Sequence, residues 1–488
     1  MNEASQIIYP TFTLFLYDLQ EELGQDAEKI RQNRHCFWRK IEADLDRDYE
    51  DLDESGRQRL DELAALEKPE ASSVELFPEA PQGKRSLGDD LDGYLYALQL
   101  GDTYALQVNY SGKAQAQGQP DFAAKSLDRL PQMQRGLLAL LDRDRSRDDG
   151  SPTLSPEKQG NIGQTWLLWA KLPGNHPESS QVARACRQQL IPEGQWEKPQ
   201  SVQGRFAGAT LYEIWQAPLD WEHPGSENQH LLLLLFPPRQ TLDGVRDTMA
   251  TLYPHLLRLC CYRNKILWAY SRSRSLKRQL KADYIEIETI ANALRGQLRD
   301  RDSADRFSPL ILDRLREKLV ETLELSARYA RHLNDLDHQA RTIRANLASY
   351  TQQVKKIAEL DPDSQLDVLS EFADGPAEIY RLQIETDRAR FAVGSELLQN
   401  VINTLNGAID LQQATPIDEN SKFSKPDLTP VLMAVGTGIA TTQATSLAWT
   451  SRPANADKSQ ISPFFGLLLS LLAGIVGGAI AWKLCRSR

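Results

Sequence analysis

The 488-residue sequence has little cysteine, and its five thiols are scattered at Cys36, Cys186, Cys260, Cys261 and Cys485. No two of them have the C-x-x-C spacing, and an odd, scattered set argues against both a disulfide framework and a structural zinc site. The sequence therefore predicts a protein of a reducing compartment. We expect Cys260 and Cys261 to be small buried residues that pack against a sheet.

An excess of positive charge is also missing. Lysine and arginine total 57 against 67 aspartate and glutamate residues, which gives a formal net charge of −10. A chain with this balance is not built to coat nucleic acid. Hydrophobic residues make up 41% and charged residues 25%, a globular composition that excludes a wholly disordered or collagen-like chain. A length of about three typical domains predicts two or three folded units.

Sequence motifs of common enzymes are absent as well. The chain contains no P-loop, no dinucleotide-binding glycine fingerprint, no nucleophile-elbow serine and no H-E-x-x-H zinc motif. His332 and His338 would point about 120° apart on a helix and cannot share a metal ion. His35 beside Cys36 is a poor basis for a catalytic dyad, because neighbours in sequence are seldom partners in space. We therefore predict a non-enzymatic protein with no catalytic, cofactor-binding or metal-binding residue. An enzyme in the amino-terminal domain is a further alternative.

Long uncharged apolar runs are rare, and the clearest lies near the carboxyl end. Pro463–Trp482 contains twenty residues without a charge, about the length of a helix that crosses a hydrocarbon core of about 30 Å. Phe464 and Phe465 border it on one side, and the basic tail of residues 483–488 follows on the other. These features predict a membrane span.

A second, weaker candidate span, Leu428–Trp449, is also free of charge. Small residues recur at every fourth position of both segments, a spacing that lets helix backbones approach closely in lipid. These positions are Gly436, Ala440, Ala444 and Ala448 in the first segment and Gly466, Ser470, Gly474 and Gly478 in the second. Because residues 1–20 lack an export signal and the tail is basic, we expect a transmembrane hairpin with both termini in the cytoplasm. A single carboxy-terminal anchor is the alternative.

Heptad-like apolar spacing marks the middle of the chain. Apolar residues alternate in steps of three and four from Leu312 to Ile357, and again from about Ala377 to Gln413. This spacing predicts two long helices in coiled-coil packing, with interruptions at Asp361-Pro362-Asp363 and Gly375-Pro376. The apolar side of the second helix begins with Ile379, Leu382, Thr386, Ala389 and Val393. An earlier helix is expected, with breaks, from about Thr241 to Arg299. Each helix alone would expose a long apolar stripe, which predicts packing among the helices or in a homo-oligomer.

A basic segment lies within the earlier helix. Between residues 258 and 281 it holds eight lysines or arginines and no acid, with Tyr262, Trp268 and Tyr270 interleaved. This basic patch consists of Arg258, Arg263, Lys265, Arg272, Arg274, Lys277, Arg278 and Lys281. Three partners are open for it. They are the acidic run of residues 42–54 in the same chain, which we favour, anionic lipid headgroups, and nucleic acid, which we favour least.

Residues 90–240 contain the mixture of short strand-like and helix-like segments that is typical of an α+β domain. Strand-like runs at Tyr94–Leu100 and Tyr104–Tyr110 are joined like a hairpin at Gly101-Asp102. Further strands are expected at Gln164–Leu172, Ala209–Gln216 and His230–Phe236, and helices at Leu127–Leu141 and Ser180–Leu190. The fold class that we predict is α+β, with an amino-terminal antiparallel domain, long coiled-coil-like helices and a carboxy-terminal transmembrane hairpin.

The expected domain boundaries follow from these segments. We predict an acidic helical head at 1–68, a linker at 69–89, the α+β domain at 90–240 and the long-helix region at 241–414. A second linker at 415–427 precedes the transmembrane hairpin at 428–482 and a basic cytoplasmic tail at 483–488.

Two patches carry a resemblance to known families. Tyr329–Tyr350 and Gln383–Ala414, followed by the glycine-rich pair of spans, resemble two-span bacterial membrane proteins, chiefly cyanobacterial, of NTPase-containing conflict loci. This resemblance implies an NTPase or another protein as a partner. The layout is also similar to that of the CorA family of divalent-cation channels, although Trp449-Thr-Ser-Arg452 stands in place of that family's Gly-Met-Asn signature. A channel of this kind would use Thr437, Thr441 and Thr445 as a hydroxyl stripe, for which helix–helix hydrogen bonding is the simpler explanation.

These observations predict a non-enzymatic, membrane-anchored oligomer that senses a signal or executes a response at the membrane. The alternative is a CorA-like cation channel or transporter. The expected partners are membrane lipid, further copies of the same chain, and an NTPase or other protein, and no cofactor is expected.

Overall fold

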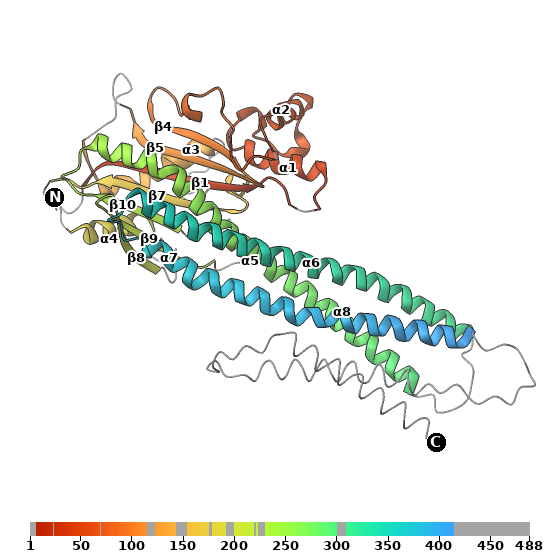
Figure 1. The fold of residues 1–488 in the computed structure, drawn as a ribbon. Coiled ribbons are helices and arrows are strands. Elements are labelled where there is room, and N and C mark those ends of the chain that lie inside the picture. Colours follow the sequence, from red (N-terminus) through yellow and green to blue (C-terminus); the bar gives the residue numbers. More distant parts are fainter. Residues whose placement is uncertain are drawn as a thin grey trace, which may run out of the picture. The chain divides into compact units, whose positions relative to one another are not determined.

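The computed structural model describes residues 6–22, 24–68, 70–114, 123–142, 154–174, 178–191, 200–218, 221–222, 230–299 and 309–413. The chain divides into two compact units, one of residues up to 292 together with 317–398, the other of residues 293–316 together with those from 399 onward. The larger unit contains a mixed sheet and the greater part of three long helices (Figure 1). This confirms the α+β class and the long helices that follow the sheet.

A ten-stranded sheet forms the layer on which the other elements of the larger unit pack. Its order is β2-β4-β5-β1-β7-β10-β9-β8, and β3 and β6 pair with β4 and β1 off this path. The strands are β1 (Gln6–Leu19), β2 (Val74–Glu75), β3 (Lys84–Ser86), β4 (Leu91–Leu100), β5 (Thr103–Lys113), β6 (Ala124–Ser126), β7 (Gly163–Lys171), β8 (Gln200–Phe206), β9 (Ala209–Trp215) and β10 (His230–Phe236). The pair β7–β10 is parallel and the other pairs are antiparallel, so the sheet is mixed and not purely antiparallel. A parallel pair needs a crossover, and α4 (Ser179–Leu190), β8 and β9 lie in the chain between these two strands.

The central strand β1 contradicts the prediction of a helical head. It pairs with β5 on one side and with β7 on the other. Its sequence is rich in isoleucine, phenylalanine, tyrosine and threonine, which suit a buried strand. Pro10 lies where the register with β7 shifts between Ile8 and Thr11, so it does not interrupt a regular ladder. The head prediction is therefore wrong for residues 6–19, although α1 (Ala27–Trp38) and α2 (Glu54–Ala64) are helical.

Most other elements of the sheet domain lie where the sequence predicts them. The hairpin β4–β5, the strands β7, β9 and β10, and the helices α3 (Leu130–Leu141) and α4 are confirmed. The predicted linker at 69–89 instead contributes β2 and β3, both of which pair with β4. The strand β8 was not among the expected strands, and it pairs with β9 at the end of the sheet.

Different helices cover the two faces of the sheet. Phe12 and Leu14 of β1 belong to one apolar core with residues of α1, α2, α3 and α4. On the other face, Tyr17 of β1 donates a hydrogen bond to the carbonyl oxygen of Leu257 at 2.8 Å, in the helix α5 (Leu242–Arg299). Alternation along β1 therefore separates an apolar face beneath α1–α4 from a face beneath α5 that includes polar groups.

The long helices follow the sequence prediction with two corrections. The helix α5 is a single helix of 58 residues that contains Pro254, so the expected breaks in this segment are wrong. The helices α6 (Pro309–Leu360) and α8 (Glu378–Gln413) are confirmed, and α6 ends just before Asp361-Pro362. Gly375-Pro376 does not interrupt the helical backbone. It lies in a π-helical turn, Ala373–Ala377, that joins the short α7 (Asp367–Phe372) to α8.

Polar contacts fix the direction of α6 against α8 within the larger unit. Arg344 of α6 binds Glu385 of α8 at 2.8 Å. Tyr329, earlier in α6, donates to the carbonyl oxygen of Phe391, later in α8, at 2.6 Å. Since rising numbers on α6 meet falling numbers on α8, these two helices are antiparallel neighbours (Figure 1).

The apolar seams of the two helices have different outcomes. The helix α6 buries Leu336 and Ile343 of its predicted seam. The predicted seam of α8 begins with Ile379 and Leu382, which are 61% and 50% exposed, while Ile384 is buried in their place. The sequence therefore predicts the wrong inward face for this part of α8.

The predicted transmembrane hairpin, the linker before it, the basic tail and both stripes of small and hydroxyl residues lie outside the described residues. Among the helices that the structure describes, none is both long enough and apolar enough to cross a bilayer. The membrane prediction thus rests on the sequence of residues 428–488.

Gly394 offers a test of the packing of α8 on α6. A Cβ atom at this position would lie 2.2 Å from the Tyr329 hydroxyl oxygen and 2.6 Å from its Cζ. Because Tyr329 is buried, we expect Gly394→Ala to lower the free energy of unfolding by about 1–3 kcal/mol in denaturant unfolding of the full chain.

Gly407→Ala is the matched control on the same helix. A Cβ atom there would meet no described atom within 4 Å. Alanine should therefore raise the free energy of unfolding by up to about 1 kcal/mol through helix propensity. Equal effects of the two substitutions would contradict the contact between Gly394 and Tyr329.

Candidate functional site

Five polar side chains meet in the interior where α5 packs on the sheet, and we call them the junction cluster. They are Thr165 of β7, Glu213 of β9, His230 of β10, and Arg263 and Asn264 of α5. The strands β7, β10 and β9 are neighbours in the sheet, which brings their three residues together beneath α5. No member is more than 4% exposed.

A chain of hydrogen bonds runs through four members of the cluster. Asn264 Nδ2 donates to Thr165 Oγ1 at 3.1 Å. Thr165 Oγ1 lies 3.0 Å from His230 Nδ1, and His230 Nε2 lies 2.9 Å from Glu213 Oε1. With Glu213 ionised, the threonine hydroxyl donates to Nδ1 and the Nε2–H donates to the carboxylate. With Glu213 protonated, the carboxyl donates to Nε2 and the Nδ1–H donates to Thr165. Gain or loss of one proton by Glu213 therefore switches the cluster between two hydrogen-bond patterns.

Burial shifts both ionisable partners toward their neutral forms. It raises the pKa of Glu213 from 4.5 to about 7, although the nearby positive charge of Arg263 acts in the opposite direction. Burial also holds the pKa of His230 well below 6.5, and Arg263 lowers it further. The imidazole is therefore neutral at pH 7, and Glu213 is the group of the cluster that exchanges a proton near neutral pH.

Arg263 carries the charge that the cluster must balance. Its Nε lies 3.8 Å from Glu213 Oε1, and its guanidinium lies over the rings of Phe372 and Trp215, at 4.5 and 5.4 Å from their centres. Within the described residues, Arg263 Nε, Arg263 Nη2 and Glu213 Oε2 have no hydrogen-bond partner. A buried cation is costly without a counter-ion. The ionised form of Glu213 and the two aromatic faces are therefore what holds Arg263 in place.

The junction cluster can hold and relocate a proton, and its five side chains are buried among the described residues. A hydroxyl, an imidazole and a carboxylate in line are also the parts of a nucleophilic relay. Here Thr165 is fully buried and its oxygen already contacts Asn264 and His230. The cluster therefore joins α5 to three neighbouring strands of the sheet.

Sequence reasoning found only Arg263 among the five, as a member of the basic patch. A usable signal was present in the strands. Glu213 is the one charged residue of ATLYEIW, and His230 opens the run HLLLLLF. A polar residue in a fully buried strand needs a partner, so two such residues in neighbouring strands point to a buried network.

The basic patch is partly paired within the chain, but not with the predicted acidic run. The pairs are Arg263 with Glu213, Lys265 with Asp102, Arg272 with Glu22, Lys277 with Asp387 and Arg278 with Glu222. Glu42 of the acidic run instead binds Arg85 at 2.8 Å. The predicted docking is wrong because Leu45 and Leu52, within that run, pack in the core on the α1–α4 face, whereas α5 covers the opposite face.

Four members of the patch stay exposed on α5, namely Arg272, Arg274, Arg278 and Lys281. Tyr270 is buried and stacks on Tyr380 with ring centres 4.2 Å apart, so it is not available to stack on a base. Binding of the exposed residues to lipid headgroups or to nucleic acid stays a prediction.

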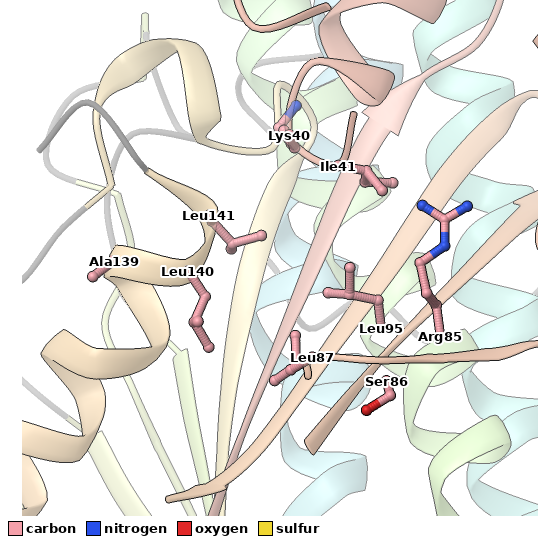
Figure 2. A pocket seen from close by; sticks show the side chains of 9 residues that line it. All are labelled: Lys40, Ile41, Arg85, Ser86, Leu87, Leu95, Ala139, Leu140 and Leu141. Carbon is pink, nitrogen blue, oxygen red and sulfur yellow. The ribbon is translucent and has the colours of Figure 1, made fainter. Parts of the chain in front are cut away.

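A separate pocket of about 290 Å³ lies on the other face of the sheet (Figure 2). Its lining consists of Lys40, Ile41, Arg85, Ser86, Leu87, Leu95, Ala139, Leu140 and Leu141. Both cations are neutralised, Lys40 by Asp18 at 2.9 Å and Arg85 by Glu42. The pocket therefore presents polar and apolar surface in about equal parts, and its two charged side chains already have partners.

The histidines singled out in the sequence have partners of other kinds. His332 Nδ1 lies 2.8 Å from Asp283 Oδ2, and His35 Nε2 lies 3.1 Å from the carbonyl oxygen of Leu45. Burial raises the pKa of the Cys36 thiol, which disfavours the reactive thiolate. In the described parts of the chain, no three histidine, cysteine or acidic side chains gather as a metal site.

Comparison with known proteins assigns no relative to this chain: no family model, no curated protein and no solved structure matches it. The resemblances to two-span membrane proteins and to the CorA family therefore stay predictions from the sequence.

Titration of Glu213 gives a signed prediction of stability. Because the folded pKa of about 7 exceeds the ordinary value of 4.5, the folded state holds the proton more tightly, and this contribution to stability is lost as the pH rises from about 4.5 to about 7. Glu213→Gln removes the titration. We therefore expect the free energy of unfolding of the variant, relative to the original chain, to rise by up to a few kcal/mol over this interval.

Denaturant unfolding of both chains at pH 5 and pH 7.5 would measure this difference. His230 has a lowered pKa and contributes with the opposite sign, but it is present in both chains. The exposed substitution Glu396→Gln on α8 is the control. A difference between Glu213→Gln and the original chain that does not vary with pH would show that Glu213 does not titrate in this range.

Proposed function

We propose that this chain is a non-enzymatic, membrane-anchored, oligomeric protein whose α+β domain responds to a signal and relays it to the membrane along the long helices. The observation that carries the proposal is the continuity of α5, which packs on the sheet and on the other helices without an intervening loop.

The first part of α5 is tied to the sheet. Tyr253 Oη accepts hydrogen bonds from Asn109 Nδ2 and Trp169 Nε1, both at 2.6 Å. Asn264, one turn after Cys260, enters the junction cluster. A shift of β7, β9 or β10 therefore acts directly on α5.

The later part of α5 is tied to the other helices. Lys277 binds Asp387 of α8 at 2.7 Å, and Asp283 binds Arg328 of α6 at 2.9 Å. A rigid helix that joins two packed layers moves both when it moves. The junction cluster, at the first of these contacts, is where a change of one proton would alter the packing.

The membrane part of the proposal is supported by the sequence. Pro463–Trp482 has the length and the basic flank of a span, and Leu428–Trp449 carries a matching stripe of small residues. The proposed partners are membrane lipid, further copies of this chain, and an NTPase or another protein, as the resemblance implies.

A CorA-like channel is the second candidate. It is favoured by the order of an α+β domain and then long helices, which the structure describes, followed by two apolar segments in the sequence. Ion flux through the full chain in liposomes separates the two candidates. Flux that falls on Thr441→Val would favour the channel over the relay.

Reporter fusions test the membrane arrangement. We expect a reporter before Met1 and a reporter after Arg488 both to lie in the cytoplasm, because the tail of residues 483–488 is basic and a hairpin returns the chain to the side on which it began. A carboxy-terminal reporter outside would leave a single crossing, and a fully soluble chain would overturn the membrane anchor.

Hydrogen exchange tests the relay through α5. In the full chain at pH 7, Glu213→Gln should change amide exchange by at least about twofold in α5 beyond Lys277 and in α8 near Asp387, as well as in β9 and β10. The control Glu396→Gln should leave β9 and β10 unchanged. Changes confined to the strands would contradict a relay along α5.

A further inference from the structure

The short helix α7 packs directly on the charged part of the junction cluster. The centre of the buried Phe372 ring, at the end of α7, lies 4.5 Å from the Arg263 guanidinium and 5.5 Å from the centre of the Tyr350 ring of α6. Arg263 Nε also lies 3.8 Å from Glu213 Oε1 of β9. One cation of α5 therefore has an aromatic partner on α7 and an acidic partner in the sheet.

The helix α7 depends on these contacts for its position. It has six residues and no side-chain cap at its first turn, so it is too short to be stable without packing. Just before it, the backbone of Gln365 exchanges two hydrogen bonds with Arg205 of β8, at 2.8 and 2.9 Å. At its far end, the π-helical turn of Ala373–Ala377 leads into α8, and such turns often occur at functional sites. The chain before α7 is thus fixed to the sheet, whereas the Phe372 end is held by side chains.

The ionised form of the cluster is incompletely matched. Among the residues described, Arg263 Nε, Arg263 Nη2 and Glu213 Oε2 are buried without a hydrogen-bond partner. Water that entered beneath α7 would supply these missing hydrogen bonds. The protonated form needs less, because a neutral carboxyl bonds to His230 and the cation keeps its aromatic partners.

We propose that α7 is a proton-controlled cover, which stays closed while protonated Glu213 leaves Arg263 to the Phe372 ring, and opens to water when loss of the proton gives Arg263 a carboxylate partner. The inference rests on the proposed relay. It names the signal as a change of pH and α7 as the element that responds first. Because α7 continues into α8 through the π-helical turn, the response reaches α8 directly as well as through α5.

The groups that surround this ion pair come from five elements besides β9. They are Arg263 and Cys260 of α5, His230 of β10, Tyr350 of α6, Glu371 of α7 and Tyr380 of α8. The neighbouring strand β8 places Val202, which has no ionisable group, opposite Glu213.

Most of these groups keep one charge state near neutral pH. Burial raises the pKa of Cys260 and of Tyr380 to about 12 and that of Tyr350 well above its ordinary value, so all three stay neutral. His230 is neutral because burial lowers its pKa. Glu371 is an exposed acid whose negative charge raises the pKa of Glu213 slightly further. Glu213 is therefore the group whose charge changes.

A rise in pH favours the open arrangement. In the closed arrangement, burial outweighs the attraction of Arg263 and raises the pKa of Glu213 to about 7. Once water reaches the carboxyl, its pKa returns toward the ordinary value of 4.5. The ionised form is thus relatively more stable in the open arrangement, and opening increases between about pH 4.5 and pH 7.

Hydrogen exchange of the full chain at pH 5 and pH 7.5 tests the cover. After correction for the intrinsic exchange rate at each pH, we expect the protection of the α7 amides to be at least about tenfold lower at pH 7.5. Glu213→Gln cannot ionise, so its α7 protection should differ less than about twofold between the two conditions. The matched control is Glu371→Gln, the exposed acid on α7, which should keep a fall of at least about fivefold.

Three results would overturn the cover. They are equal α7 protection at the two pH values in the original chain, an undiminished fall in Glu213→Gln, and a fall of the same size in the central strand β1. The last result would show that the whole fold responds and not α7. The comparison within the original chain needs no variant, and a cooperative unfolding transition would confirm that each variant folds.

The same measurement separates the cover from the relay. A pH-dependent α7 without exchange changes in α5 beyond Lys277 or in α8 near Asp387 would support the cover and contradict the relay. Changes in α5 beyond Lys277 that leave α7 unaltered would support the relay and overturn the cover.

Discussion

The transfer of the Arg263 guanidinium from water into the space between the sheet and α5 is the constraint on which the arrangement of the larger unit depends. The cation keeps its place through Glu213 on one side and through the rings of Phe372 and Trp215 on the other. These partners come from β9 and α7, far from α5 in the sequence. Because an unpaired buried charge costs several kcal/mol, the three elements must keep their relative positions together. A change in the ionisation of Glu213 therefore changes the interaction that holds β9, α7 and α5 together.

The sheet carries a buried ion pair on each face. Asp18 and Lys40 pair at 2.9 Å beneath α1, and Glu213 and Arg263 face one another beneath α5. Such pairs add little net stability compared with apolar contacts, but they penalise every arrangement that separates them. A slip of β1 by one residue would turn Asp18 to the opposite face, away from Lys40. The two ion pairs therefore fix the register of the strands. Burial of the apolar core that includes Phe12 and Leu14 supplies most of the free energy of folding.

The sequence predicts the elements whose signals are local. Gly101-Asp102 between two alternating runs identifies β4–β5, and HLLLLLF identifies β10. It fails for β1, where Pro10 argues against a strand until the shifted register with β7 is known. It also fails for the junction cluster. Thr165 of β7 and Asn264 of α5 are 99 residues apart. They meet because α5 follows β10 in the chain and β7 lies beside β10 in the sheet, an order that no local pattern encodes.

The two faces of α8 show why periodicity alone misplaces a packed surface. The more regular apolar face, with Ile379 and Leu382, lies outward, whereas the inner face includes Asp387 and Gly394. Asp387 is tolerated there because Lys277 neutralises it, and Gly394 leaves the room that the Tyr329 hydroxyl occupies. The residue types at these two positions are explained by contacts with α5 and α6, and the sequence pattern of α8 alone does not reveal them. The regular face has no such partner among the described helices, and its first two members stay half exposed or more. Ile379 and Leu382 are 61% and 50% exposed, so covering them would contribute about half of the 1.5–3 kcal/mol that complete burial of such a side chain supplies.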